Sequence, residues 1–197
     1  MQPASARPIL IDALLPAAGL PVWVRNGLLA VGGSLLLTLS AKINVPFYPV
    51  PMTMQTFAVI LIGAAFGWRL GTATVLFYLA QGAMGLPVFA GTPEKGIGLA
   101  YMMGPTGGYL FGFAVAAFVT GWLCERGFDR SLLRLTAAMF IGHLVIFAFG
   151  IAYLGALIGY ERAWAFGVAP FYLATLFKTL LAAACMKAGW SIANLRG

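Results

Sequence analysis

The sequence predicts an all-α integral membrane protein, a single domain of six transmembrane helices. Of its 197 residues, 61% are hydrophobic and only 9% are charged, whereas soluble domains are roughly 45–50% apolar and about 25% charged. Long uncharged stretches alternate with short charged segments, and about 20 apolar residues suffice to cross a bilayer. This composition excludes an ordinary soluble enzyme. The basic residues are scattered singly, so the net charge of +7 does not indicate nucleic-acid binding.

Six apolar windows, of which only the last is interrupted (by Lys178), define the expected helices. The first two helices are short for a span, and the ends of the first would need Arg25 and Lys42 to snorkel to the interface. The sequence lacks the alternating apolar and polar segments that are typical of a membrane barrel. The expected helices lie near residues 26–42, 53–67, 71–89, 107–124, 135–159 and 166–187.

The positions of lysine and arginine predict the topology, because cytoplasmic loops are enriched in both. With the N-terminus inside, eight basic residues lie on the cytoplasmic side, and three lie outside. The eight are Arg7, Arg25, Arg69, Arg126, Arg130, Arg134, Lys187 and Arg196, and the three are Lys42, Lys95 and Arg162. We therefore expect a cytoplasmic N-terminal segment at 1–25, a transmembrane domain at 26–190 and a cytoplasmic tail at 191–197.

The first expected helix carries a face of small residues. Ala30, Ser34 and Thr38 recur every four residues, and Gly33 lies beside them. Such a face permits close contact between helices, either within one bundle or with another membrane subunit.

The first outer loop, residues 44–56, has three prolines within six residues. Proline disfavours helix at the residue before it, so the loop is expected to be stiff and extended. One interpretation is a rigid connector whose hydroxyl groups cap the next helix. The other is an aromatic lid, formed by Phe47 and Tyr48, over a cavity that has Thr53, Gln55 and Thr56 at its mouth.

The next outer segment, residues 85–109, is rich in glycine. Thr106 is the expected N-cap of the fourth helix, and Gly107 and Gly108 occupy its first turn. Bare glycines at a helix start let backbone N–H groups approach a ligand oxygen, but a glycine pair serves close helix packing equally well. No P-loop pattern occurs in the sequence, so ATP hydrolysis by that route is not expected.

Lys178, in the last expected helix, has no obvious partner. A cation near the bilayer centre costs at least ~2.5–3.5 kcal/mol, so it normally faces a cavity and a partner. Snorkelling to the interface is the alternative, but a ligand site is favoured. Thr175 lies three residues earlier on the same helical face. All five carboxylates lie outside the spans: Asp12, Glu94, Glu125, Asp129 and Glu161.

His143 is the only histidine, and it lies within the fifth expected helix. No further ligands are spaced to complete a metal site, and no G-x-S-x-G pattern marks a nucleophile. We therefore predict no metal, no cofactor and no catalytic residue. An intramembrane enzyme using Lys178 or His143 on a lipid is the weaker alternative.

Three segments carry a resemblance to a known family: residues 44–56 with V-P-M-T-M-Q-T, residues 85–91 with G-L-P-V-F-A-G, and residues 104–112 with G-P-T-G-G-Y-L-F-G. In combination they resemble the BioY family, the biotin-specific substrate-binding (S) components of energy-coupling-factor (ECF) transporters. The resemblance extends over about residues 25–190. It implies six helices with both termini inside and high-affinity capture of biotin from outside, for uptake across the cytoplasmic (inner) membrane.

The resemblance also implies a set of binding residues. In the family, a sixth-helix lysine with an aspartate three residues before it binds the biotin ring head. Lys178 matches the lysine, while Thr175 replaces the aspartate and brings hydrogen-bonding capacity without charge. Lys95 is the candidate for the valerate carboxylate. The remaining expected binding residues are Gly91, Gly107, Gly108, Tyr109, Gln55 and Phe47.

For partners, the resemblance implies a membrane coupling (T) subunit and two cytoplasmic ATPases. The face of Ala30, Gly33 and Ser34 matches the region where such proteins meet the coupling subunit. Some family members occur without a dedicated coupling module, so use of the chain alone or as an oligomer stays open. An S component for a different vitamin, with Thr175 marking the altered specificity, is the alternative function.

Overall fold

The computed structural model describes residues 8–16, 19–46 and 48–195. Helices form nearly all of the regular structure in these ranges, which also hold a hairpin of two short strands, β1 (Asn44–Val45) and β2 (Met52–Thr53). Two 3-10 turns lie at Phe128–Arg130 and Ala169–Phe171. The α-helices are α1 (Leu10–Leu14), α2 (Val22–Lys42), α3 (Gln55–Ala83), α4 (Gly98–Met102), α5 (Gly107–Glu125), α6 (Leu132–Ile158), α7 (Tyr160–Gly167) and α8 (Tyr172–Leu195).

Five helical runs within the described residues are long and apolar enough to cross a membrane. They are α2, α3, α5, α6 and the run from α7 through α8. The prediction of a helical, multi-pass membrane protein is confirmed at this level.

α3 is a helical hairpin, because the chain reverses at Gly67. This residue has φ 74° and ψ 173°, outside the helical region. A Cβ atom on Gly71 would lie 3.0 Å from the Cα atom of Gly63, whereas eight residues of straight helix span about 12 Å. The backbone N–H of Trp68, which begins the second half, donates to Oε1 of Glu125 at 3.0 Å. The carboxylate thereby satisfies a free N–H group at a helix start.

Several expected boundaries were wrong for local reasons. The two halves of α3 correspond to the expected helices 53–67 and 71–89, but α3 ends at Ala83 because Gly85 has φ 94° and Pro87 follows. The expected helix 166–187 begins later, at Tyr172, and continues to Leu195, so residues 191–195 of the expected tail are helical.

Thr106 occupies the N-cap position of α5, as predicted. Thr106 directly precedes α5, but its side chain makes no capping hydrogen bond. It lies instead at the wall of a cavity described below.

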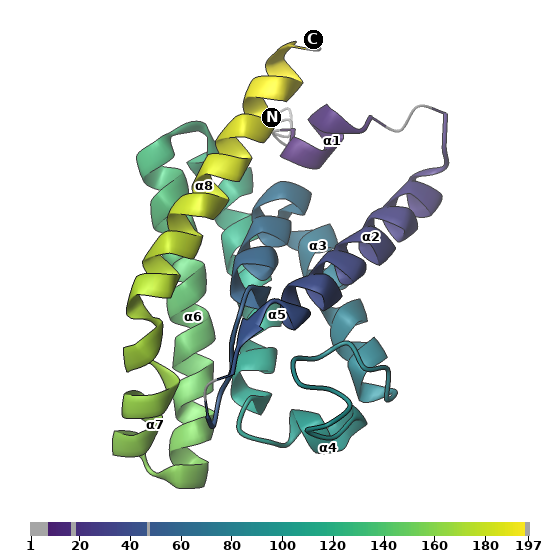
Figure 1. Ribbon diagram of the computed structural model, residues 1–197. Coiled ribbons are helices and arrows are strands. Elements are labelled where there is room, and N and C mark those ends of the chain that lie inside the picture. The colour runs from purple at the N-terminus through teal and green to yellow at the C-terminus, as the bar shows by residue number, and fades with distance from the viewer. Residues whose placement is uncertain (1–7, 17–18, 47, 196–197) are drawn as a thin grey trace, which may run out of the picture.

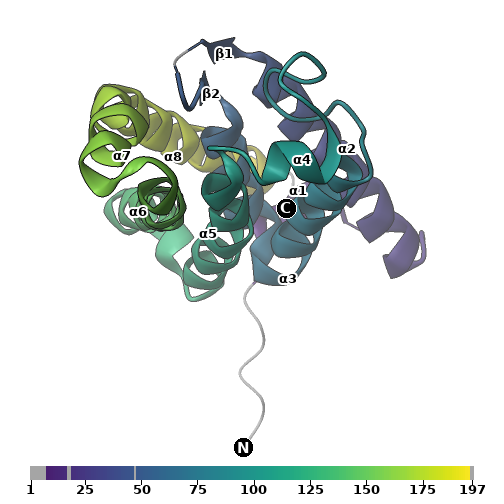
Figure 2. The ribbon, with the colours of Figure 1, turned by 90° about the horizontal axis from the view of Figure 1, so that it is seen from below.

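α5 lies between α3 and α6, as Figure 2 shows. Glycines on two of its faces let the neighbouring helices approach closely. On one face, a Cβ on Gly112 would lie 3.1 Å from Cα of Ile146 in α6. On the other, a Cβ on Gly121 would lie 2.5 Å from the backbone N of Trp68 in α3.

The two ends of the molecule differ in structure (Figure 1). The end that we call the α4 end holds the β1–β2 hairpin, α4 and α7. In the hairpin, Asn44 pairs with Thr53 and Val45 with Met52, so the loop expected to be extended includes a short antiparallel ladder. The opposite end, which we call the α1 end, holds α1, the start of α6 and the end of α8.

α2 crosses the other helices obliquely (Figure 1). Gly33 is buried against α3, where a Cβ would lie 3.3 Å from the side chain of Phe66. The Ser34 hydroxyl is buried and donates to Oε1 of Gln81, also in α3. Ala30 is half-buried. Most of the small-residue face therefore serves contact within this chain.

Candidate functional site

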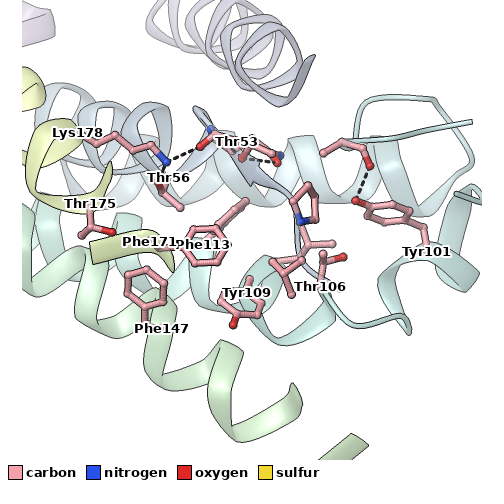
Figure 3. A pocket seen from close by; sticks show the side chains of 15 residues that line it. Thr53, Thr56, Tyr101, Thr106, Tyr109, Phe113, Phe147, Phe171, Thr175 and Lys178 are labelled. Atoms are coloured by element: carbon pink, nitrogen blue, oxygen red, sulfur yellow. Dashed lines mark hydrogen bonds between the residues drawn. The ribbon is translucent and has the colours of Figure 1, made fainter. Parts of the chain in front are cut away.

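A cavity of about 50 Å³ lies near the α4 end, between the β1–β2 hairpin and helices α3, α5, α6 and α8. Figure 3 shows its lining side chains. Lys178, Thr53 and Thr56 lie along one side of the cavity, and the rings of Phe113, Phe147 and Phe171 lie across from them. The lining residues are Val50, Pro51, Thr53, Gln55, Thr56, Ala90, Tyr101, Thr106, Tyr109, Leu110, Phe113, Phe147, Phe171, Thr175 and Lys178.

Among the described residues, Lys178 alone brings a charge to the lining of this cavity. It is 5% exposed. Its Nζ donates to the backbone oxygen of Thr53 at 2.6 Å and to Oγ1 of Thr56 at 3.4 Å. Within the described residues, no carboxylate forms an ion pair with it. The ammonium group is held by neutral oxygens alone, which leaves its charge available to a ligand.

Gln55 is the second polar anchor. Its amide nitrogen donates to the Tyr78 hydroxyl at 2.7 Å, and its amide oxygen accepts from Oγ1 of Thr53 at 3.2 Å. The Tyr78 hydroxyl in turn donates to the backbone oxygen of Val88 at 2.9 Å. This chain of hydrogen bonds fixes the orientation of the amide and connects the cavity wall to the segment after α3.

Four aromatic side chains form the opposite wall. Tyr109 and Phe113 come from α5, Phe147 comes from α6, and Phe171 comes from the turn before α8. The ring centroids of Tyr109 and Phe147 are 6.4 Å apart, and those of Phe147 and Phe171 are 6.2 Å apart. The Tyr109 hydroxyl donates to the Gly167 backbone oxygen at 2.9 Å. The cavity therefore suits a ligand with a polar head and an apolar body.

Tyr101, in α4, lies at the far end of the cavity from Lys178 (Figure 3). Its hydroxyl donates to the backbone oxygen of Ala90 at 2.6 Å, and its ring stacks on that of Phe89. Burial raises the pKa of the Tyr101 hydroxyl, so this group is a neutral donor. A neighbouring cavity of about 90 Å³ shares Pro51, Tyr101 and Thr106 with the first and is lined by Lys95.

Four of the residues expected at a binding site line the cavity together. Lys178 and Thr175 come from α8, Gln55 from α3 and Tyr109 from α5. Lys95 is exposed and reaches only the neighbouring cavity. Phe47 lies outside the described residues.

The three expected glycines do not line the cavity. A Cβ on Gly91 would lie 2.8 Å from Cδ of Lys95. A Cβ on Gly107 would meet the Met102 backbone oxygen, and one on Gly108 would lie 2.5 Å from the Phe149 backbone oxygen. Gly107 and Gly108 therefore permit close packing against backbone, while Gly91 packs against the Lys95 side chain and has a φ of 70°.

Sequence reasoning missed most of the aromatic wall, although part of it has a sequence signal. Phe113 lies four residues after Tyr109, which places both on one helical face, and Phe171 directly precedes the helix that carries Lys178. Tyr101 and Phe147 have no such relation to an expected binding residue, although Phe147 lies four residues after His143. They join the site only through the packing of α4 and α6.

Lys42, at the end of α2, forms hydrogen bonds with the segment that follows α3. Its Nζ donates to the backbone oxygens of Phe89 and Thr92, each at 3.1 Å.

We expect Lys42→Met to accelerate amide hydrogen exchange in residues 86–96 by about tenfold, because hydrogen bonds from a charged donor contribute roughly 1.5 kcal/mol or more. Hydrogen-exchange mass spectrometry checks this. Arg162→Met, which removes an exposed cation from α7, is the control, and equal exchange in all three proteins would contradict the prediction.

The comparisons with known proteins agree with one another. The BioY family profile matches residues 10–194. The chain is 40% identical over 147 residues to a probable biotin transporter BioY of Pyrococcus horikoshii, covering 75% of this chain and 85% of that protein. It is 40% identical over 149 residues to the biotin transporter BioY of Thermotoga maritima, with the same coverage.

A solved structure shares the fold. It is the S-component for biotin from an ECF-type ABC transporter, with a TM-score of 0.74 over 88% of this chain and 92% of that chain, at 21% identity. The sequence match over nearly the whole described chain, together with this fold, leads to one conclusion: the chain belongs to the BioY family.

Proposed function

We propose that this protein binds biotin and acts in its uptake across the membrane as the S component of an ECF-type transporter. The observation that carries the proposal is the cavity with the unpaired Lys178 ammonium on one side and an aromatic wall on the other. It occurs in a chain whose relatives at 40% identity are named biotin transporters.

The two sides of the cavity match the two parts of biotin. The ureido ring of biotin has one carbonyl oxygen and two N–H groups. Lys178 donates to the carbonyl oxygen, and the Thr175 hydroxyl and the Gln55 amide offer neutral polar groups. Phe113 and Phe147 pack against the sulfur-containing ring. The valerate chain runs toward Tyr101, and its carboxylate meets Lys95 at the neighbouring cavity.

Entry of biotin requires the outer segments to move. The cavity encloses about 50 Å³, whereas small-molecule sites measure about 300–1,000 Å³. Pro51 and Ala90 line the cavity from the two outer segments. We propose that these segments separate when biotin enters and close over it afterwards.

We also propose six crossings, with both termini in the cytoplasm of an inner membrane. The halves of α3, residues 55–66 and 68–83, run in opposite directions and measure about 18 Å and 24 Å at 1.5 Å per residue. Counting them separately gives an even number of crossings. Basic residues are concentrated on the side that this topology places inside.

For partners, we propose the coupling subunit and two ATPases of an ECF-type transporter. Gly33 and Ser34 pack against α3, so we extend the coupling surface from Ala30 to the exposed face of α2 that carries Leu28 and Leu35. Transport by the chain alone or as a homo-oligomer is the alternative.

Of the two alternative functions, an intramembrane enzyme and an S component for a different vitamin, only the second keeps support. The BioY family comprises transporter components and not enzymes, which removes the basis for an intramembrane enzyme. An S component for a different vitamin stays as the second candidate, because Thr175 stands where the family pattern has an aspartate.

Equilibrium dialysis of the purified chain against labelled biotin tests the proposal. We expect saturable binding with a Kd below about 1 μM, equivalent to about −8 kcal/mol. Unlabelled biotin should displace the label, and thiamin or riboflavin should not. No binding at micromolar biotin, or tighter binding of another vitamin, would overturn the proposal.

The same assay tests the assignment of Lys95. Lys95→Gln is expected to weaken biotin binding by about fivefold, because an exposed charged hydrogen bond contributes roughly 1 kcal/mol. Binding of biotin methyl ester, which lacks the carboxylate, should not change. Glu94→Gln is the neighbouring control. An equal loss for acid and ester would place the carboxylate elsewhere.

A further inference from the structure

A groove of about 680 Å³ lies at the α1 end, between the start of α6 and the end of α8. We call it the α6/α8 groove. Its lining residues differ from those of the cavity that Lys178 lines, which lies toward the α4 end. We call that cavity, which we propose as the biotin site, the biotin cavity. The proposed biotin function leaves this groove without a role.

Polarity changes along one face of α8 in the α6/α8 groove. On this face, residues spaced three or four apart line the groove: Leu180 and Ala184 are apolar and lie deeper in the span, while Lys187, Ser191 and Asn194 are polar and lie toward the end of the helix. The rest of the lining is mostly apolar and comprises Leu132, Thr136, Ala183, Ala188 and Trp190. An apolar-to-polar order along the membrane normal matches a phospholipid, with its chains inside and its headgroup at the surface.

Trp190 adds an independent observation. It lines the groove and is 8% exposed, and its ring lies 3.9 Å from the guanidinium carbon of Arg130. Its Nε1 is buried and has no hydrogen-bond partner within the part of the chain that the structure describes. Because this N–H is enclosed by the protein, Trp190 contributes its aromatic ring to the groove and no donor.

The charge at this end favours an anion. Lys187 is exposed and forms no ion pair among the described residues. Arg130 pairs with Asp129 at 3.6 Å while it stacks on Trp190. Arg126 stacks on Trp122, with 3.2 Å from its guanidinium carbon to the ring centroid. Arginine beside tryptophan is typical of the membrane interface, where basic pockets between helices bind anionic lipid headgroups.

We propose that the α6/α8 groove binds an anionic phospholipid. The lipid phosphate lies at Lys187 and accepts from Ser191 and Asn194, and one acyl chain follows Leu180 and Ala184. The charge complementarity at Lys187 selects an anionic headgroup over a zwitterionic one.

The test uses the purified full chain in neutral detergent with short-chain phosphatidylglycerol or phosphatidylcholine, and it measures the thermal unfolding midpoint and native mass spectra. We expect phosphatidylglycerol to bind at least fivefold more tightly, since each basic residue near an anionic lipid contributes about 1 kcal/mol. Lys187→Gln should abolish this preference, and Ala184→Leu, which fills the groove, should weaken both lipids. Arg162→Gln, in α7 at the α4 end of the molecule, is the charge-matched control.

Biotin binding measured on the same samples shows whether each variant is folded. Lys187→Gln should bind biotin as the parent chain does, because Lys187 lies outside the biotin cavity. The proposal is overturned if Lys187→Gln keeps the preference for phosphatidylglycerol, or if Arg162→Gln loses it equally. It is also overturned if Ala184→Leu changes the oligomeric mass but not lipid binding, since that result assigns the groove to a second copy of the chain.

Discussion

Lys178→Met is expected to weaken biotin binding by about 100-fold while the protein stays folded. A hydrogen bond from a charged donor contributes roughly 1.5–3 kcal/mol, and no other charged group in the described part of the chain lines the biotin cavity. Methionine is similar in length and fills the same space without a donor. Removing a buried charge that has no ion pair also avoids its desolvation cost, so the unfolding midpoint should not fall. Equilibrium dialysis and thermal unfolding measure the two effects.

Phe177→Met is the matched control for this prediction. Phe177 precedes Lys178 in α8 but is 63% exposed and does not line the biotin cavity. The same substitution there should leave biotin affinity unchanged. If Lys178→Met binds biotin like the parent chain, the lysine does not contact the ligand, and the proposed orientation of the ring head is wrong.

Gly121→Val is expected to have the largest effect on folding. A Cβ at this position would lie 2.5 Å from the backbone N of Trp68, 2.6 Å from the backbone carbon of Gly67 and 2.7 Å from the Gly63 backbone oxygen. All three contacts are backbone atoms at or beside the reversal of α3, so no side-chain rotation relieves them. Overpacking costs about 1–3 kcal/mol even where side chains yield. We therefore expect a loss of at least ~3 kcal/mol, seen as aggregation or an unfolding midpoint lowered by several degrees.

Gly32→Val provides the comparison. Gly32 lies in α2, and a Cβ there would meet nothing within 4 Å. This substitution should leave the yield and unfolding midpoint close to those of the parent chain. Equal behaviour of the two variants would show that α5 does not approach the α3 reversal as closely as the structure has it.

Some features depended on local sequence and were predictable. Uncharged windows mark helices because a bilayer admits few charges. Lys178 was identifiable because its charge interrupts such a window without a carboxylate in any span. The reversal at Gly67 was also partly visible, since Arg69 separates two apolar windows at this point. The sequence did not reveal that the reversal occurs at one glycine with a positive φ, Gly67. It also did not reveal that the Glu125 carboxylate caps the half-helix that follows.

Other features depended on how the helices rotate and cross. The small-residue face of α2 was compatible with contact inside or outside the chain, and only the packed structure places Gly33 and Ser34 against α3. Gly107 and Gly108 resembled a ligand-binding helix start, but their backbones are covered by close contacts with Met102 and Phe149. Small residues permit close approach both by a neighbouring helix of the same chain and by a ligand or partner subunit. The sequence pattern alone therefore does not distinguish these two uses.

The sequence by itself determined the membrane class, the apolar segments, the family and the cation at the centre of the candidate site. These properties follow from which residues a bilayer tolerates and from short motifs contiguous in the chain. Only the tertiary structure brought Phe113, Phe147 and Tyr101 to the same cavity as Lys178, and placed Lys187 and Trp190 along one groove. The physical reason is that a site assembled from several helices depends on their rotation and close approach, which many distant contacts set together.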